Sequence, residues 1–196
     1  AEPSRIALHL GGVPFDDVRP GRDEFRAMKS SGELPYGQLP VLDIDGVRIA
    51  QSGAIARFCG KVSGMYPMDN PVDAARVDEL LDTASQITAE LYPSMREKDP
   101  TTRAAMRNEI ATKTLPHWLN MLESRLTSAG HQVMFVGDAM TIADLVIWRL
   151  IGWLNSGVLD GIPTTLLDGT PALAAHFQAV QSHPGVSEWM QHHWDK

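Results

Sequence analysis

Apolar residues recur at helical spacing through the second half of the chain. One predicted helix has a face of apolar side chains at i, i+3, i+4 and i+7 spacing, formed by Val77, Leu80, Leu81, Ala84, Ile87 and Leu91. A second predicted helix is marked in the same way by Leu115, Trp118, Leu119, Leu122 and Leu126. Pro116 falls within the second helix and predicts a bend there.

Residues 142–154 are apolar almost all round, with Arg149 and Gly152 as the exceptions. A helix of this kind is buried on every side, so we expect it at the centre of the second half of the chain. Pro171 and Pro184 then predict the starts of two more short helices, because proline is favoured in the first turn.

The first 62 residues mix short helical and strand patterns. An apolar stretch over residues 6–10 ends at a pair of glycines, which predicts the end of a helix. Residues 15–18 form a brief strand candidate. Residues 21–30 are polar, and we expect a short, irregular helix there.

A hairpin and a helix follow. The segments VLDID and VRIA predict two strands, joined by the Asp45-Gly46 turn. Ser52 is expected to cap a helix that runs to about Lys61. The next segment, SGMYPMDNP, is rich in proline, glycine and asparagine and predicts a linker.

The chain therefore divides into a small α/β domain over residues 1–62, a linker over residues 63–71 and an all-helical domain over residues 72–196.

The formal net charge of −7 argues against a nucleic-acid or anionic-membrane partner, which would require a basic face. A single cysteine, Cys59, excludes a disulfide within the chain and favours a reducing, cytoplasmic compartment. No apolar run reaches the ~18 residues of a membrane helix, and no signal peptide is visible.

Several polar residues favour a structural interpretation. MTIADL predicts a capping box between Thr141 and Asp144, so Asp144 is expected to start a core helix rather than to act in catalysis. Asp78 and Asp82 indicate a solvated or subunit-facing acidic surface rather than a metal site. None of the histidines shows ligand spacing, and Cys59 has no CxxC partner and is most simply a core residue.

The stretch GQLPVLDIDGVRIAQSG suggests a binding site. A cis Leu39–Pro40 bond would turn the Leu39 backbone outward and free its N–H and C=O for a ligand. At the far end of the hairpin, the helix start at Ser52 favours an anion such as a carboxylate, and Gln51 adds a neutral donor. Each feature also has a simple structural explanation, but together they lie at one end of a small sheet.

These segments carry a family resemblance. LPYGQLPVLDIDG with QSGAIARFCG, and FVGDAMTIADLVIW, resemble segments of the cytosolic glutathione S-transferases, most closely the sigma-like class. AEPSRIALHLGGVPFDDVR resembles the first helix and second strand of that family, so the likeness covers nearly the whole chain. It implies a thioredoxin-like α/β domain followed by an all-α domain.

The resemblance also implies a glutathione site. Leu39, beside Pro40, would pair its backbone with the cysteinyl part of glutathione, and Gln51 and Ser52 would hold the γ-glutamyl carboxylate. Further contacts toward glutathione are implied for Gln38, Lys29, Phe25 and Gln86. Gln38 and Lys29 would face the glycyl end. Phe25 stands where Trp is common, and Gln86 where an acidic residue reaches the glutathione of the partner subunit.

The catalytic Tyr of the family lies in a first strand that would precede Ala1, so no residue of this chain is expected to activate the thiol. The leading hypothesis is a cytoplasmic, homodimeric transferase of detoxification. It would conjugate glutathione to a small hydrophobic electrophile, bound around residues 92–103 and near Trp194. The alternatives are a prostaglandin D synthase-like, glutathione-dependent isomerase and a non-catalytic, crystallin-like relative. A thioredoxin-like reductase is a further option, but the lack of CxxC argues against it.

Overall fold

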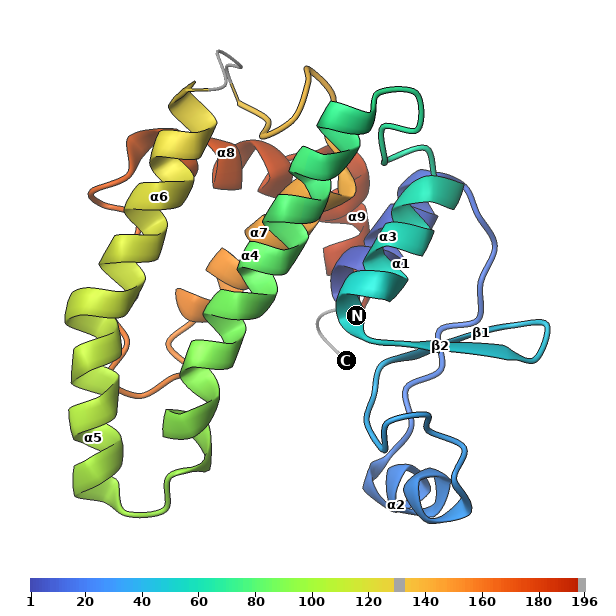
Figure 1. Cartoon of the computed structure of the whole chain (residues 1–196), viewed down its shortest axis with the longest axis horizontal. Helices are drawn as coiled ribbons and strands as arrows, with labels where there is room; N and C mark the ends of the chain where they lie inside the picture. The colour runs from blue at the N-terminus through green and yellow to red at the C-terminus, as the bar shows by residue number, and fades with distance from the viewer. Residues whose placement is uncertain (129–132, 194–196) are drawn as a thin grey trace.

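The computed structural model describes residues 1–128 and 133–193 and has two halves (Figure 1). The first contains helices α1 (Glu2–Leu10), α2 (Arg22–Ser31) and α3 (Ser52–Val62) and strands β1 (Val41–Ile44) and β2 (Val47–Ala50). Helices α1 and α3 lie side by side, the hairpin extends from the start of α3, and α2 lies at the far end of this half. A small sheet flanked by helices agrees with the predicted α/β arrangement.

The predicted hairpin is confirmed. β1 and β2 pair antiparallel, with Val41 opposite Ala50 and Ile44 opposite Val47. Asp45 and Gly46 form the connection, with φ angles of 51° and 86°. A two-residue turn with both φ angles positive matches the right-handed twist of the strands, and Asp-Gly is a favoured sequence for it. The local sequence thus fixes this register.

The second half is helical. Its elements are α4 (Pro71–Arg96), α5 (Pro100–Glu109), the π-helix η1 (Ile110–Thr114), α6 (Leu115–Ser128), α7 (Ile142–Leu154), α8 (Pro171–Gln181) and α9 (Pro184–His193). Each predicted helix is present. Where the sequence predicts a bend at Pro116, the chain forms the π-helical segment η1, which ends two residues before the proline. A wider turn accommodates a residue that lacks an N–H and clashes with the carbonyl of a regular helix.

Helix α7 lies at the centre of the molecule, as its apolar sequence predicts. Nine of its residues are buried, and it packs against α1, α3, α4 and α8. The crossing with α3 is close, because a Cβ on Gly60 would lie 2.8 Å from Ile142 Cγ2. Since α7 contacts both halves, the same helix builds the core and sets how the halves meet.

Three predictions about the first half need correction. Residues 15–18 form no strand, because no strand among the described residues lies beside them. Side chains fix this segment instead: Phe15 packs against Trp189, and Asp17 accepts hydrogen bonds from two arginines. Ser52 is the first residue of α3 rather than its cap. Finally, α2 is a regular helix, bounded by Gly21 and by Gly32 in the left-handed region.

Asp144 has the structural role that the sequence indicates, whereas Asp78 and Asp82 form ion pairs within the chain instead of only an acidic surface. The Asp144 carboxylate is fully buried and accepts from the Thr141 N–H at 2.7 Å, which confirms its half of the capping box. Asp78 and Asp82 both bind Arg57, each at 2.7 Å, and so tie α4 to α3. The described residues contain no cluster of three or more potential metal ligands.

Candidate functional site

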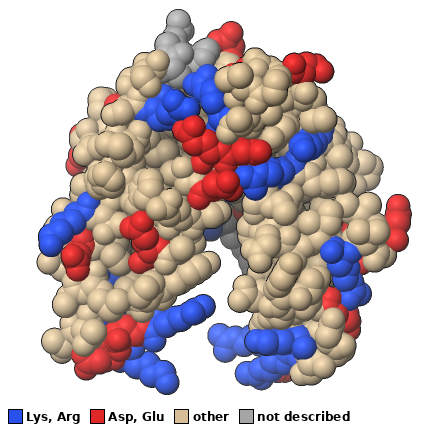
Figure 2. Space-filling view, in the orientation of Figure 1, with Lys and Arg blue, Asp and Glu red and all other residues tan. Residues whose placement is uncertain are grey.

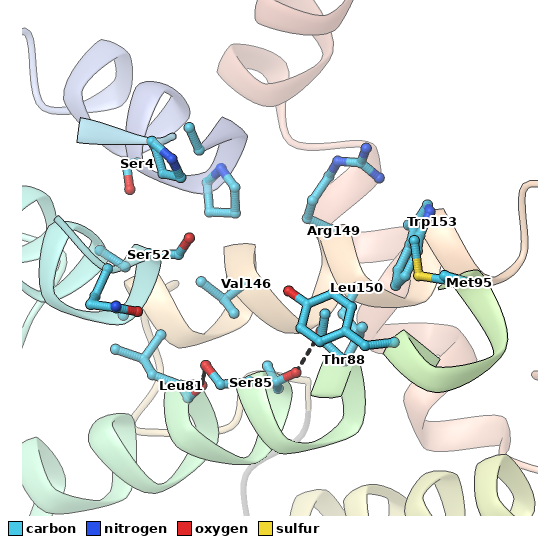
Figure 3. A pocket seen from close by; sticks show the side chains of 18 residues that line it. Ser4, Ser52, Leu81, Ser85, Thr88, Met95, Val146, Arg149, Leu150 and Trp153 are labelled. Carbon is cyan, nitrogen blue, oxygen red and sulfur yellow. Dashed lines mark hydrogen bonds between the residues drawn. The ribbon is translucent and has the colours of Figure 1, made fainter. Parts of the chain in front are cut away.

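A cavity of about 650 Å³ lies between the two halves (Figure 3). Its walls come from the start of α1, the junction of β2 and α3, one face of α4 and one face of α7. Pro40, Gln51 and Ser52 lie on the side of the first half. Tyr92 and Met95 lie on the other side, near the end of α4. The predicted proline segment and helix start therefore open into one cavity.

The junction of β2 and α3 presents a helix N-terminus to this cavity. Gln51 occupies the cap position with φ 73° and ψ 118°, and its carbonyl accepts from the Ile55 N–H at 3.0 Å. Gln51 and Ser52 are both exposed. No side chain among the described residues caps this helix, and its first turn contains no acidic residue. The amides and dipole of the first turn are therefore available to an anionic group.

The Leu39–Pro40 peptide bond is cis, as predicted. Pro40 lines the large cavity, whereas Leu39 lines an adjoining hollow of about 380 Å³. Gln38 and Phe25 line the same hollow. Two consecutive residues thus line one space each, so a ligand extended along Leu39 and Pro40 would contact both spaces.

Two predicted contacts lie outside both spaces. Lys29 is exposed on α2, and its side chain runs beside the proline segment: a Cβ on Gly37 would lie 3.4 Å from Lys29 Cε. Gln86 is exposed on α4 and is not among the residues that line the cavity. The structure therefore brings together Phe25, Gln38 and the segments at 39–40 and 51–52, and leaves Lys29 and Gln86 at the periphery.

The expected electrophile region lies only partly along the cavity. Tyr92 and Met95 line the cavity, but Arg103 does not, and pairs instead with Asp160 at 3.3 Å. Trp194 lies outside the described residues. Sequence reasoning missed the wall that α7 contributes, formed by Val146, Arg149, Leu150 and Trp153. Only Arg149 gave a signal, as a charge in an otherwise apolar helix.

Burial shifts the pKa values of two side chains, Arg149 and Cys59. Burial lowers the pKa of the half-buried Arg149 guanidinium, and the Glu2 carboxylate opposes that shift. Burial raises the pKa of the Cys59 thiol, which is 1% exposed and packs with Leu8 and Ile55. The Cys59 thiol is therefore a core group, as its position in the sequence predicts, whereas Arg149 faces the cavity.

Comparison with known proteins shows to which family a chain with this fold and cavity belongs. A model of the glutathione S-transferase C-terminal domain matches residues 82–193. Glutathione S-transferase 1 of Ascaris suum is 32% identical over 195 residues, which cover 96% of this chain and 89% of that protein. The chain belongs to the glutathione S-transferase family. Hematopoietic prostaglandin D synthase of Gallus gallus is also similar to this glutathione S-transferase, at 31% identity over 97% of the chain and 89% of that protein.

Solved structures agree with this assignment. Prostaglandin synthase D of Nilaparvata lugens matches with a TM-score of 0.85 at 25% identity, over 98% of this chain and 92% of that one. The glutathione S-transferase from Ascaris lumbricoides matches with a TM-score of 0.81 at 29% identity, over 97% and 90%. This glutathione S-transferase thus has the predicted fold, a thioredoxin-like first half and a helical second half. None of its described helices is both long and apolar enough to cross a membrane.

Proposed function

We propose that this chain is a transferase that binds glutathione as its co-substrate and conjugates it to small hydrophobic electrophiles. One observation carries the proposal: Pro40, which follows the cis peptide bond, and the open start of α3 line the same cavity, and Leu39 lines the hollow next to Pro40. A tripeptide with a carboxylate at one end needs both features, namely backbone groups along its length and an anion site at its end.

Glutathione would lie across the two spaces. The γ-glutamyl carboxylate would sit at Gln51 and Ser52, where the exposed helix start favours negative charge. The cysteinyl part would pair with the backbone of Leu39, and the glycyl end would extend toward Gln38 and Lys29. Phe25 would support this end from α2, and Gln86 would reach the γ-glutamyl amine of glutathione in the partner subunit.

The reaction follows from this placement. Loss of the thiol proton to solvent gives the thiolate, whose sulfur attacks the electrophilic carbon and, for an aryl halide, displaces the halide. A thiol pKa lowered by two units corresponds to ~2.7 kcal/mol of selective thiolate stabilisation. The electrophile would occupy the apolar part of the cavity, between Met95, Leu150 and Trp153. We assign no residue of this chain as the thiol activator.

Two serines at the two ends of α3 provide a matched test. Ser52 begins the helix at the cavity, whereas Ser63 follows its other end and donates to the Gly60 carbonyl at 3.2 Å. With 1-chloro-2,4-dinitrobenzene, Ser52→Ala should lower kcat/KM for glutathione about tenfold, because a hydrogen bond to a charged group contributes ~1.5–3 kcal/mol. The kcat at saturating glutathione should change little. Ser63→Ala should match the parent protein. Equal kinetics for both variants, or no conjugation at all, would refute the proposal.

A second function is a glutathione-dependent isomerase. It is favoured by the similarity to two proteins named as prostaglandin synthases, one of them with a TM-score of 0.85. Product analysis with an endoperoxide substrate distinguishes the two functions, because isomerisation regenerates free glutathione and conjugation consumes it. A non-catalytic, crystallin-like relative would give neither product, whether or not it binds glutathione.

We further propose a cytoplasmic homodimer that acts in detoxification. Exposed apolar side chains near the junction of the two halves support self-association, in particular Met68 and Val72, which are 65% and 67% exposed. Light scattering should give a mass of roughly twice the 21.5 kDa of one chain. Met68→Glu should shift the mass toward one chain if this surface is the interface. The single cysteine supports a reducing compartment.

A further inference from the structure

Two hydroxyl groups lie in the middle of the cavity wall that helix α4 forms. Ser85 and Thr88 line the cavity one helical turn apart, and Leu81 and Ala84 beside them are apolar (Figure 3). Thr88 precedes Met95 by seven residues, which is about 10 Å along the helix. A few polar groups in a largely apolar wall determine which ligands bind and how they are oriented.

The hydroxyl hydrogens of these two residues are used within α4. Ser85 donates to the Leu81 carbonyl at 2.9 Å, and Thr88 donates to the Ala84 carbonyl at 2.8 Å. A hydroxyl oxygen that has donated its hydrogen in this way keeps its lone pairs. Toward a ligand in the cavity, both side chains therefore act as hydrogen-bond acceptors rather than donors.

Thr88 is the better placed of the two acceptors. It is half-buried, whereas Ser85 is exposed. Because water competes less at a partly buried oxygen, a hydrogen bond from a ligand to Thr88 contributes more to selectivity. Thr88 also lies one turn before Tyr92, which lines the cavity on the side where we place the electrophile.

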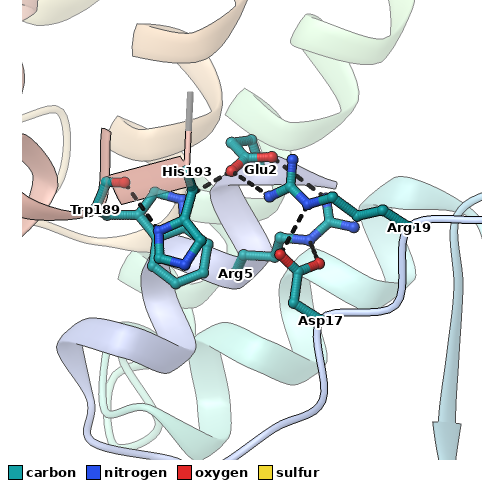
Figure 4. A network of polar contacts seen from close by, with 6 residues as sticks. All are labelled: Glu2, Arg5, Asp17, Arg19, Trp189 and His193. Carbon is teal, nitrogen blue, oxygen red and sulfur yellow. Dashed lines mark hydrogen bonds and ion pairs between the residues drawn. The ribbon is translucent and has the colours of Figure 1, made fainter. Parts of the chain in front are cut away.

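The cavity provides no carboxylate for a donor on a ligand. No aspartate or glutamate is among the described residues that line it. Glu2, at the start of α1, is only 8% exposed and is occupied by other groups (Figure 4). Its carboxylate accepts from Arg5 at 3.3 Å, from Arg19 at 3.2 Å and from the Trp189 indole N–H at 2.7 Å. A donor on the electrophile is therefore left with neutral acceptors such as Thr88.

The charges around the opening favour a neutral donor over a cationic one. Figure 2 shows Lys and Arg side chains on both sides of the opening between the two halves. Arg22 lines the smaller hollow, and the Arg96 guanidinium lies 5.6 Å from the centre of the Tyr92 ring. An ammonium group would meet these positive charges without a carboxylate in the cavity wall to pair with it. A hydroxyl or an amide N–H is not repelled in this way.

We propose that Thr88 makes this cavity selective for electrophiles that carry a neutral hydrogen-bond donor, a hydroxyl or an amide N–H, on an apolar frame. The inference rests on the proposed transferase function and adds the substrate class. The apolar frame contacts Leu150, Trp153 and Met95, and the donor binds the Thr88 oxygen. During conjugation the donor group is unchanged: the sulfur–carbon bond forms, and the halide leaves with the bonding electron pair.

A matched pair of electrophiles tests the inference, namely N-methyl-4-chloro-3,5-dinitrobenzamide and methyl 4-chloro-3,5-dinitrobenzoate. The N–H of the amide is replaced by an oxygen in the ester, and the rest of the molecule is the same. The measured quantity is the amide-to-ester ratio of kcat/KM in the full chain, each value divided by its non-enzymatic rate with glutathione. Thr88→Val keeps the shape of the side chain and removes the hydroxyl. It should lower the ratio about two- to tenfold, as expected for the loss of one neutral hydrogen bond.

Thr83 provides a matched control on the same helix. Like Thr88, it donates to a carbonyl of its own helix, that of Glu79 at 2.7 Å, but it is not among the residues that line the cavity. Thr83→Val should leave the ratio unchanged. Thr88→Ser should keep most of the preference because it keeps the hydroxyl. An equal loss of preference in Thr88→Val and in either of these two variants would overturn the inference.

The remaining outcomes separate the inference from the transferase function. An unchanged ratio in Thr88→Val would overturn the inference, while conjugation of both compounds would uphold the transferase function. No conjugation of either compound or of 1-chloro-2,4-dinitrobenzene would overturn both. If Thr88→Val does not fold, Thr88→Ala removes the same hydroxyl and introduces the residue that favours a helix most. The ratio should then fall by a similar factor, and an unchanged ratio would overturn the inference.

Discussion

Replacing Asp144 tests whether this carboxylate holds the fold or takes part in the chemistry. Its side chain is 0% exposed and meets four groups. It accepts from the Thr141 N–H at 2.7 Å, from the Thr141 hydroxyl at 2.9 Å and from the Phe135 N–H at 3.0 Å. His176 Nε2 lies 3.1 Å from the same carboxylate. Three separate segments therefore depend on one side chain.

The expected loss of stability in Asp144→Ala follows from the groups that this substitution leaves without a hydrogen-bond partner. Asp144→Ala leaves two buried backbone N–H groups unpaired, each at a cost of ~1–3 kcal/mol, and removes the carboxyl group beside His176. We expect a loss of about 4 kcal/mol in the free energy of unfolding, within the range of ~3–5 kcal/mol for breaking a buried polar pair. For a chain of this size the Tm should fall by about 8–16 °C. Asp144→Asn should lose about half as much, because either amide orientation turns an NH₂ group toward a backbone N–H.

Circular dichroism during thermal and urea unfolding measures the loss, at one fixed protein concentration because subunit association would affect the Tm. Activity is measured well below the lowered Tm. Asp144→Asn should then keep a kcat within a few-fold of the parent protein at saturating glutathione. The reasoning fails if Asp144→Ala costs less than about 1 kcal/mol, well below the cost of two unpaired N–H groups. It also fails if folded Asp144→Asn loses about a hundredfold in kcat, because Asp144 would then act in the chemistry.

Two further predictions concern packing and acid sensitivity. Gly60→Ala should destabilise the fold by about 1–3 kcal/mol, because its Cβ would lie 2.8 Å from Ile142 Cγ2. Gly152→Ala, with 3.5 Å to the nearest atom, should change stability by less than about 1 kcal/mol; equal urea midpoints for the two variants would contradict this. Burial raises the pKa of Asp17, but hydrogen bonds from Arg19 and nearby positive charge outweigh it and hold the pKa below 3.8. The ionised carboxylate stabilises the fold above its unfolded pKa, and this contribution is lost as the pH falls through the lower folded value. Asp17→Asn should therefore weaken the pH dependence of the free energy of unfolding below about pH 4. If this dependence is the same as in the parent protein, Asp17 is not the group responsible.

Sequence reasoning succeeded where neighbouring residues determine the structure. The Asp45-Gly46 turn fixes the hairpin because the conformation depends on those two residues. The Asp144 capping box spans only one helical turn, and its spacing is visible in the sequence. The fold followed from the same short signals, together with the family resemblance of the segments that contain them.

Sequence reasoning failed where contacts between segments that are distant in the sequence determine the structure. Residues 15–18 have apolar ends, but a strand requires a neighbouring strand, and here side-chain contacts with α1 and α9 hold the segment instead. The cavity wall from α7 was missed for a similar reason. The sequence indicates that α7 is buried, but not which of its faces meets a space rather than another helix. That distinction depends on how α4 and α1 are placed.

The two charges of α7 make the same point within one helix. Asp144 and Arg149 are five residues apart, so they project roughly 140° apart around the helix axis. Asp144 meets Phe135 and His176 in the core, and Arg149 meets the cavity. Their substitutions should accordingly separate: Asp144→Asn should lower the free energy of unfolding, and Arg149→Gln should lower it less because Arg149 is only half-buried, whereas Asp144 is fully buried. If both variants lowered the free energy of unfolding equally, α7 would not divide core from cavity as we describe.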